Sequence, residues 1–239
     1  MNPASDDHDN EAELSLDGNA MFEEPENFRP KTPPPTEHVV ARTVAGAVPA
    51  ELRVRLVGHH SLWAHCMWNA GVHLAHYFDE HCALVRGKTV LELGAAAALP
   101  SMVAALNGAL RGYLWGAQVA PLLTTLPADH KTFDVIVLAD LIFNHNSHAD
   151  MLRTCQQSLT RSKDAKVYVV YSHHRPWLAE RDMAFFKLAA EEPFNFVVTP
   201  LFEVKMPPMF AEDPGDVDVR STVHGHLLTW PEAALEPAQ

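Results

Sequence analysis

The chain has 239 residues, of which 47% are hydrophobic and 20% charged, a balance typical of a folded domain with a sizeable core. Its 30 acidic residues outnumber its 18 lysines and arginines, and the formal net charge of -12 disfavours nucleic acid and favours a basic partner. The sequence contains neither an apolar signal segment nor a run of about 18 apolar residues, so we expect a cytoplasmic protein with no membrane partner.

Residues 1–37 differ in composition from the rest of the chain. They hold ten acidic residues against Arg29 and Lys31, and three consecutive prolines, 33–35, interrupt any helix. Such a segment buries too little apolar surface to offset its ordering entropy. We therefore predict a disordered acidic, proline-rich arm over 1–37 and a single domain over 38–232.

From residue 38 onward, strand and helix patterns alternate. Alternating or continuous apolar runs predict strands, and apolar residues three and four apart predict helices. Repeated strand–helix units imply parallel strands with right-handed crossovers, and a last strand reached through a loop suggests an antiparallel partner. In chain order we expect a strand at 54–57, a helix with Trp63, Met67, Gly71, Leu74 and Phe78 on one face, a strand at 88–93, a helix at 100–107, a short strand at 113–115, a helix at 119–126, a strand at 133–139, a helix at 147–158, a strand at 167–171, a helix at 178–191, and strands at 194–204 and 223–230.

A glycine turn follows the predicted strand at 88–93. The run from Leu91 to Ala98 reads Leu-Glu-Leu-Gly-Ala-Ala-Ala-Ala, which places small residues at the carboxyl edge of a parallel sheet. Open α/β sheets bind nucleotides and nucleosides at this edge. Only Gly94 is present, so the dinucleotide fingerprint of three glycines is not met. A plain strand-to-helix turn packed with alanines explains the run equally well.

Several motifs together resemble one enzyme family. The chain is similar to the seven-strand methyltransferases that use S-adenosylmethionine. More narrowly, it resembles the fungal protein N-terminal and lysine methyltransferases that act on translation elongation factor 1-alpha, a group also labelled nicotinamide N-methyltransferase-like. The resemblance covers about residues 55–230 and rests on Met67-Trp-Asn-Ala-Gly71, Leu91-Glu-Leu-Gly-Ala-Ala-Ala97, Gly112-Tyr-Leu-Trp-Gly116, Leu138-Ala-Asp-Leu-Ile-Phe-Asn-His145, His173-His-Arg-Pro176, Glu212-Asp-Pro-Gly-Asp216 and Val219-Arg-Ser-Thr-Val-His-Gly225.

The resemblance implies an α/β fold with a Rossmann-like, doubly wound, mostly parallel sheet of the class I methyltransferase type. It also implies a site for S-adenosyl-L-methionine. Gly94, Ala95 and Ala96 would line its methionine moiety, and Trp68 would reach it from the preceding helix. Trp115 would pack on its adenine, and Ala139 would flank it at a strand end. Core packing is the alternative explanation for both tryptophans.

Three polar residues after the strand at 133–139 are candidate catalytic groups: Asp140, Asn144 and His145. Methyl transfer is a direct displacement that needs an aligned neutral amine and a proton acceptor, but no enzyme nucleophile. Asp140 would hold a basic amine and His145 would take a proton. A turn carboxylate and a surface-loop histidine are the respective alternatives. The fifteen histidines lack the spacing of a zinc signature, so we expect no metal.

A segment is missing by comparison with the family pattern. That pattern follows Asn107-Gly-Ala109 with a strand ending in an acidic residue and then a helix, whereas this chain runs almost directly into Gly112 and has no acidic residue between Glu92 and Asp129. One strand–helix unit of roughly 30 residues is absent by ordinary element lengths. Losing the carboxylate that binds the ribose hydroxyls costs about 1.5–3 kcal/mol. A skipped exon or faulty gene model, a shortened isoform and a degenerate paralogue all account for the gap.

Ala98 also occupies a position where the family usually has glycine. We therefore expect weak cofactor binding in a chain whose family activity is methylation of the N-terminal amine and adjacent lysine of elongation factor 1-alpha. The chain is expected to be a monomer. A small-molecule, nicotinamide-like N-methyltransferase and a non-catalytic binding protein on the same fold are the alternatives.

Overall fold

The computed structural model describes residues 32–108, 119–124, 126, 128 and 130–235. The chain divides into two compact units, Met1–Pro33 and Pro34–Gln239, and every element below belongs to the second. The predicted arm lies almost wholly outside the described residues, as do Trp115 and the predicted strand at 113–115. Within the described part, none of the helices has the length and apolar character that crossing a membrane requires.

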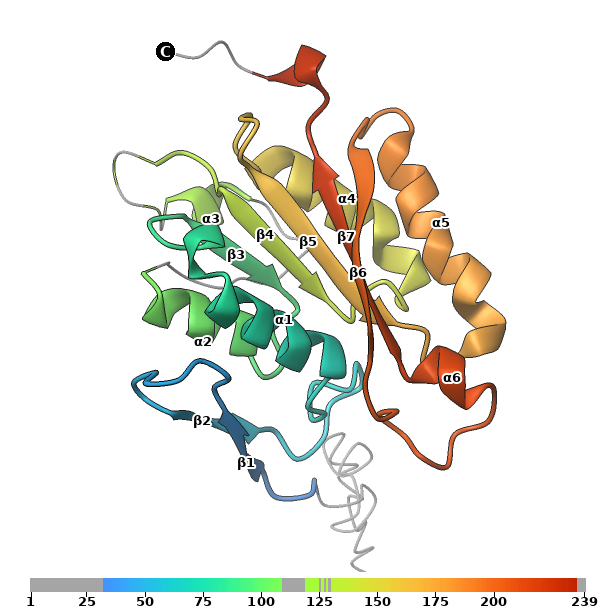
Figure 1. Ribbon diagram of the computed structural model, residues 1–239. Helices are drawn as coiled ribbons and strands as arrows, with labels where there is room; N and C mark the ends of the chain where they lie inside the picture. The colour runs from blue at the N-terminus through green and yellow to red at the C-terminus, as the bar shows by residue number, and fades with distance from the viewer. Residues whose placement is uncertain (1–31, 109–118, 125, 127, 129, 236–239) are drawn as a thin grey trace, which may run out of the picture. The chain divides into compact units, whose positions relative to one another are not determined.

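A five-stranded sheet forms the middle of this unit (Figure 1). Its strand order is β3 (Val90–Leu93), β4 (Val135–Ala139), β5 (Lys166–Ser172), β7 (Thr222–Thr229) and β6 (Val197–Lys205). β3, β4 and β5 are parallel, and β7 runs antiparallel to both β5 and β6. The predicted mostly parallel sheet with a late antiparallel strand is therefore confirmed.

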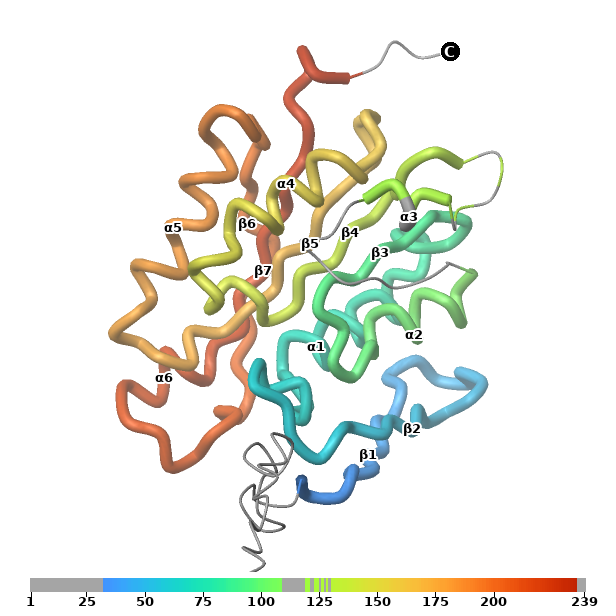
Figure 2. Tube along the Cα trace, turned by 180° about the vertical axis from the view of Figure 1, so that it is seen from behind, coloured from blue at the N-terminus to red at the C-terminus, as the bar shows by residue number. Residues whose placement is uncertain are grey.

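Helices cover both faces of this sheet, as Figure 1 and the reverse view in Figure 2 show. One face packs against α1 (Asn69–Glu80) and α2 (Leu99–Leu106), and the other packs against α4 (His148–Ser158) and α5 (Ala179–Ala190). Side chains alternate between the two faces along each strand. The sheet is thus doubly wound, as the apolar runs predicted.

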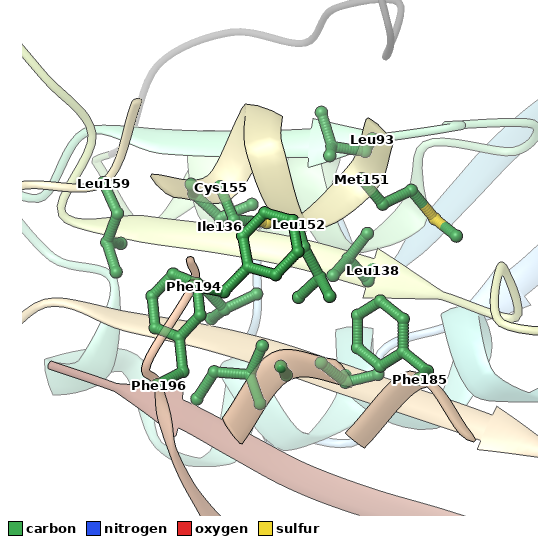
Figure 3. Packing of buried hydrophobic residues seen from close by; sticks show 14 of the residues in the cluster. Leu93, Ile136, Leu138, Met151, Leu152, Cys155, Leu159, Phe185, Phe194 and Phe196 are labelled. Carbon is green, nitrogen blue, oxygen red and sulfur yellow. The ribbon is translucent and has the colours of Figure 1, made fainter. Parts of the chain in front are cut away.

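Two hydrophobic clusters, one on each face, hold these layers together. Figure 3 shows the cluster beneath α4 and α5, where Leu93, Ile136 and Leu138 from the strands meet Met151 and Phe185 from the helices. All five side chains are buried. Burial of this kind contributes about 1.5–3 kcal/mol for each large apolar side chain and is the main source of stability.

An N-terminal hairpin packs against α1. Strands β1 (Thr36–Ala41) and β2 (Glu51–Leu56) pair antiparallel, and alternate residues of β2, namely Leu52, Val54 and Leu56, join the cluster around α1. β1 was not predicted, and its first two residues, Thr36 and Glu37, were assigned to the arm.

The ends of several helices differ from the predicted ones. α1 begins at Asn69, so Trp63 and Met67 precede the helix instead of continuing its apolar face. The predicted helix at 119–126 is the four-residue α3 (Ala120–Leu123). The remaining short elements are α6 (Val217–Arg220) and the 3-10 turns η1 (Cys82–Leu84), η2 (His145–Ser147), η3 (Pro176–Leu178) and η4 (Glu232–Ala234).

A buried ion pair ties the hairpin to both helices of its layer. Arg42, beside the end of β1, donates from Nε to Asp79 Oδ2 of α1 at 2.9 Å, and its Nη2 also contacts Oδ1 of the same carboxylate. Asn107, at the end of α2, lies near the same carboxylate. The hydrogen bond from Arg42 holds the pKa of Asp79 below its usual range.

β3 has one hydrogen-bonded neighbour among the described strands, β4, although all four of its residues are buried. The described sheet thus has five strands, where the seven-strand fold has two more. One of these two strands belongs to the unit predicted to be missing, and the other is the strand predicted at 113–115, which lies outside the described residues.

Candidate active site

The glycine turn leaves the end of β3 with two residues in left-handed backbone. Gly94 has φ of +66° and Ala98 has φ of +54°. Glycine adopts this conformation without a steric penalty, whereas an alanine Cβ approaches its own carbonyl and costs roughly 1–2 kcal/mol. The sequence placed Ala98 at a usual glycine position, and the backbone shows the physical reason for that preference.

Glu92 supports the helix that follows this turn. Ala98 precedes α2 and has no side chain that can cap it, but the backbone N–H of Ser101 donates to Glu92 Oε2 at 3.0 Å. The carboxyl group therefore satisfies one of the free N–H groups of the first turn. Burial raises the pKa of Glu92, and the bond from Ser101 opposes part of that rise.

A small slot lies beside the turn. Predicted cofactor residues Gly94, Ala96, Ala139 and Trp68 line it together, and its volume is about 20 Å³. Trp68 reaches the slot from the residue before α1 and not from within a helix. Ala95 is exposed and is not part of the lining. Trp115, the other predicted aromatic contact, lies outside the described residues.

A larger cavity of about 460 Å³ is also lined by Trp68. Four aromatic side chains line it: Trp63, Trp68, Phe143 and Phe210. Phe143 packs edge-on against Trp63 at 5.7 Å and stacks on Trp68 at 6.1 Å between ring centroids. The Trp68 indole N–H donates to the Trp63 carbonyl at 3.2 Å, which fixes one indole relative to the other. The rest of the wall is polar and comprises His145, His174, Arg175, Arg181, Asp182 and Asp213, with Leu178.

Asp140 is a buried junction at the carboxyl edge of the sheet. Its Oδ1 accepts from the backbone N–H of Ser172 at 3.0 Å and lies 3.1 Å from His174 Nε2, and its Oδ2 accepts from the backbone N–H of Ala70 at 3.2 Å. Its side chain is 1% exposed and is absent from the cavity lining. The carboxylate therefore meets the cavity through His174, and it joins the ends of β4 and β5 to the start of α1.

The structure separates the other two predicted catalytic residues. Asn144 precedes the short turn η2, makes no capping bond with its side chain and is not part of the cavity lining. His145 does line the cavity, and its Nε2 lies 2.7 Å from Asp182 Oδ1. His145 is thus paired with a buried carboxylate and is not a free loop histidine.

Sequence reasoning missed Asp182 and the roles of His173 and His174. Asp182 sits on α5, 37 residues after His145, and an acidic residue in a helix ordinarily lies on its solvated face. The motif beginning His173-His174 was the available signal, but it carried no assigned role. Within the residues that the structure describes, no three His, Cys, Asp or Glu side chains gather where they could hold a metal ion.

Strained backbone is concentrated around the two hollows. Among the described residues, four that are not glycine have positive φ, and three of them, Trp63, Ala98 and Asp140, lie in or beside the slot and the cavity. Such conformations persist where the surrounding structure imposes them, and they cluster at functional sites.

Curated relatives show the family. A protein N-terminal and lysine N-methyltransferase efm7 from Schizosaccharomyces pombe is 40% identical, with 92% of this chain and 98% of the relative covered. Proteins of the same name from Neurospora crassa and Candida albicans are each 37% identical, covering 90% and 91% of this chain and 89% and 97% of their own lengths. This chain belongs to the protein N-terminal and lysine N-methyltransferase family. The resemblance seen in the sequence motifs is therefore confirmed.

Two other comparisons add no evidence about the family. A scan against protein-family models finds no match. Among solved structures, a putative SAM-dependent methyltransferase from Streptococcus mutans is 13% identical with a TM-score of 0.48, over 74% of this chain and 53% of its own.

The alignment to the family member from Schizosaccharomyces pombe spans 253 positions and includes 92% of this chain, or about 220 of 239 residues. About 33 of its positions therefore hold no residue of this chain. That these positions form one strand–helix unit after Ala109 stays a prediction.

Proposed function

We propose that this chain is an S-adenosyl-L-methionine-dependent methyltransferase that modifies the N-terminal amine and adjacent lysine of translation elongation factor 1-alpha in the cytoplasm. The relatives are named for methylation of protein N-termini and lysines, which supports these two kinds of amine as acceptors. The elongation factor itself comes from the sequence resemblance. The net charge of -12 favours encounter with a basic protein.

The observation that carries the proposal is the position of Trp68. This indole lines both the slot at the glycine turn and the aromatic cavity. A methyl donor at the turn and an acceptor in the cavity would therefore lie beside the same side chain. Methyl transfer also needs the two to meet, and alignment of the reacting atoms supplies much of the rate enhancement of a direct displacement.

The cavity has the chemistry of a site for a basic amine. Its aromatic faces attract ammonium groups and methylated amines, and desolvation strengthens that attraction. Asp182 and Asp213 provide negative charge in the wall beside Arg175 and Arg181, and His145 provides an imidazole. A substrate amine could thus enter charged and lose its proton in place.

The slot fits one end of the cofactor, which when bound supplies an electrophilic methyl group on a sulfonium. Gly94, Ala96 and Ala139 expose backbone and small side chains there, which suits the methionine moiety. Its volume of about 20 Å³ is far below the roughly 300–1,000 Å³ of a typical ligand site. The stretch between Glu92 and Asp129 also offers no carboxylate to the ribose hydroxyls. We therefore expect weak cofactor binding by this chain.

We assign the acceptor side of the reaction to Asp140, Asn144 and His145. Asp140 orients His174 and the strand ends, His145 accepts a proton at the cavity wall, and Asn144 borders the same loop. The donor side is assigned to Trp68, Gly94, Ala95, Ala96, Trp115 and Ala139, as in the family pattern. The domain over 38–232 would act as a monomer.

A labelling experiment tests this function. The purified full chain is incubated with S-adenosylmethionine carrying a radioactive methyl group and a lysate of cells that lack the enzyme. Label in a protein of elongation-factor size, lost in Asp140→Asn and kept in the exposed helix variant Asp150→Asn, is the expected result. Label confined to small metabolites would support a nicotinamide-like amine as the acceptor and contradict the protein substrate.

One observation favours a second function, that of a non-catalytic binding protein. No acidic residue lies between Glu92 and Asp129, and about 33 positions of the alignment to the Schizosaccharomyces pombe relative hold no residue of this chain. Capture of purified elongation factor 1-alpha with no methyl transfer at millimolar donor would support this function. Transfer that saturates with donor would exclude it.

A further inference from the structure

Asp182 holds two histidines from different parts of the fold, one on each of its oxygens. His145 Nε2 lies 2.7 Å from Oδ1, and His173 Nδ1 lies 2.7 Å from Oδ2. The Asp182 side chain is 6% exposed, against 15% for His145 and 10% for His173. This triple joins α5 to the loop after β4 and to the end of β5.

The two hydrogen bonds determine which ring nitrogens carry protons. An ionised carboxylate only accepts hydrogen bonds, so His145 must carry a proton on Nε2 and His173 on Nδ1. His145 Nδ1 is then the nitrogen that keeps a lone pair. Since both oxygens of Asp182 are engaged, the carboxylate is fixed against rotation and so is the ring of His145.

The two histidines open onto different spaces. His145 and Asp182 line the aromatic cavity, whereas His173 lines a separate open groove of about 580 Å³ with Glu203 and His224. His173 contacts Asp182 without being part of the cavity lining. It holds the carboxylate without occupying the space that an acceptor would need.

We propose that Asp182 is a positioning residue that makes His145 Nδ1 the proton acceptor for the amine in the cavity, with His173 holding Asp182 in place. This inference rests on the proposed methyl transfer. The acceptor ammonium gives one proton to Nδ1, which leaves a neutral amine and an imidazolium. The amine lone pair then forms a bond to the methyl carbon of the sulfonium donor, and the electron pair of the broken carbon–sulfur bond remains on sulfur.

A second carboxylate–histidine pair in the same wall provides a matched comparison. His174 Nε2 lies 3.1 Å from Asp140 Oδ1, an oxygen that already accepts from the backbone N–H of Ser172. The His174 ring also packs 5.0 Å from Trp68 and 6.4 Å from Phe210. It is held in the aromatic wall by these rings, so we assign it to the wall and not to proton transfer.

The first test measures the tautomer of His145 in the protein alone. In ¹⁵N-labelled wild type, the imidazole signals of His145 should show a proton on Nε2, and the same spectrum is expected for Asp150→Asn. In Asp182→Asn the amide can offer its N–H in place of an acceptor, so the Nε2-protonated form should lose its dominance. His173→Gln retains a donor toward Asp182 and should keep the wild-type tautomer even where Asp182→Asn fails to fold. An Nδ1-protonated His145 in wild type would overturn the proposal.

The second test is chemical rescue of methyl transfer. Removing a positioned general base lowers the rate by about 100-fold or more, so His145→Ala should fall by that amount at nearly unchanged KM for the protein acceptor. Free imidazole added to the buffer should restore part of the rate in His145→Ala, because the vacated space lies in the open cavity. The same addition should not restore His174→Ala. Rescue of His174→Ala alone would overturn the assignment.

The two tests separate this inference from the proposed function. If wild type transfers no methyl group to any protein, the proposed function fails, and the tautomer spectra still decide whether Asp182 sets the proton position on His145. If wild type transfers methyl but neither His145→Ala nor Asp182→Asn slows it, the proposed function stands and this inference fails.

Discussion

The two ends of the sheet's carboxyl edge differ in how complete they are. At the end of β5, Asp140, Asp182 and their histidines form closed hydrogen-bonded groups around a cavity of about 460 Å³. At the end of β3, the slot has about 20 Å³, and a strained alanine follows the turn. In the proposed function the cavity takes the acceptor and the slot takes the donor, which we call the acceptor half and the donor half. We therefore expect the acceptor half to work and the donor half to bind weakly.

The fold survives because the donor half has its own internal support. β3 is buried on both faces, and α1 and α2 pack together over it with the hairpin outside them. The pair between Arg42 and Asp79 fastens that layer. We therefore expect the stability of the donor half to depend on this ion pair.

Asp79→Ala should have the largest effect on stability. Its removal leaves Arg42 buried and unpaired, a change that costs about 3–5 kcal/mol. Because the pKa of Asp79 is lowered in the folded protein, its contribution is present at neutral pH and is lost as the pH falls from about 3.9 through the lower folded pKa. Urea denaturation at pH 7 and at a series of pH values below about 4 measures both, and the gap between wild type and Asp79→Asn should shrink steadily across that series. A loss below about 1 kcal/mol for Asp79→Ala would show that the support lies elsewhere.

Restoring the missing segment should have the next largest effect. A chimera carries the unaligned segment of the Schizosaccharomyces pombe relative between Ala109 and Gly112. One recovered carboxylate–ribose contact is worth about 1.5–3 kcal/mol, so S-adenosylmethionine should bind roughly 10- to 150-fold more tightly. Calorimetric titration of both proteins checks this, with an Asp-to-Asn version of the inserted acidic residue as the control. Micromolar affinity of the unmodified chain for S-adenosylmethionine would contradict the expectation that its donor half binds weakly.

Elements with regular apolar spacing, and site residues that lie in short motifs, could be predicted from the sequence. Strands such as 133–139 and helices such as 147–158 were predicted because their apolar spacing reports local burial directly. β1 was missed because Thr36-Glu-His-Val-Val-Ala41 is short and half polar, and its partner strand decides its conformation. The slot residues came from three short motifs, one each around Trp68, Gly94 and Ala139. Asp182 could not be found in this way, because its partners are set by the packing of α5 on the sheet.

Trp63→Leu should weaken acceptor binding without altering donor binding. The change keeps an apolar side chain but removes an aromatic face from the cavity, where a cation–π contact is worth about 1–2 kcal/mol. The KM for the protein acceptor should therefore rise roughly 5- to 30-fold, with a smaller rise for Trp63→Phe. Steady-state kinetics with varied acceptor and fixed donor measures this. An equal rise in the donor KM would mean that the two halves of the site are not separable.

Ala98→Gly should have the smallest effect, and it acts on the donor half alone. Glycine relieves the left-handed strain at this turn, which is opposed in part by its greater freedom in the unfolded chain, so we expect a net gain of about 0.5–1 kcal/mol. The matched control is Ala105→Gly in α2, where backbone is helical and the same substitution should cost about 0.5–1 kcal/mol. Opposite signs in thermal unfolding of the two variants would locate the strain at the turn. If Ala98→Gly also tightened S-adenosylmethionine binding in the chimera, the strained methyl group, together with the lost carboxylate, would account for the incomplete donor half.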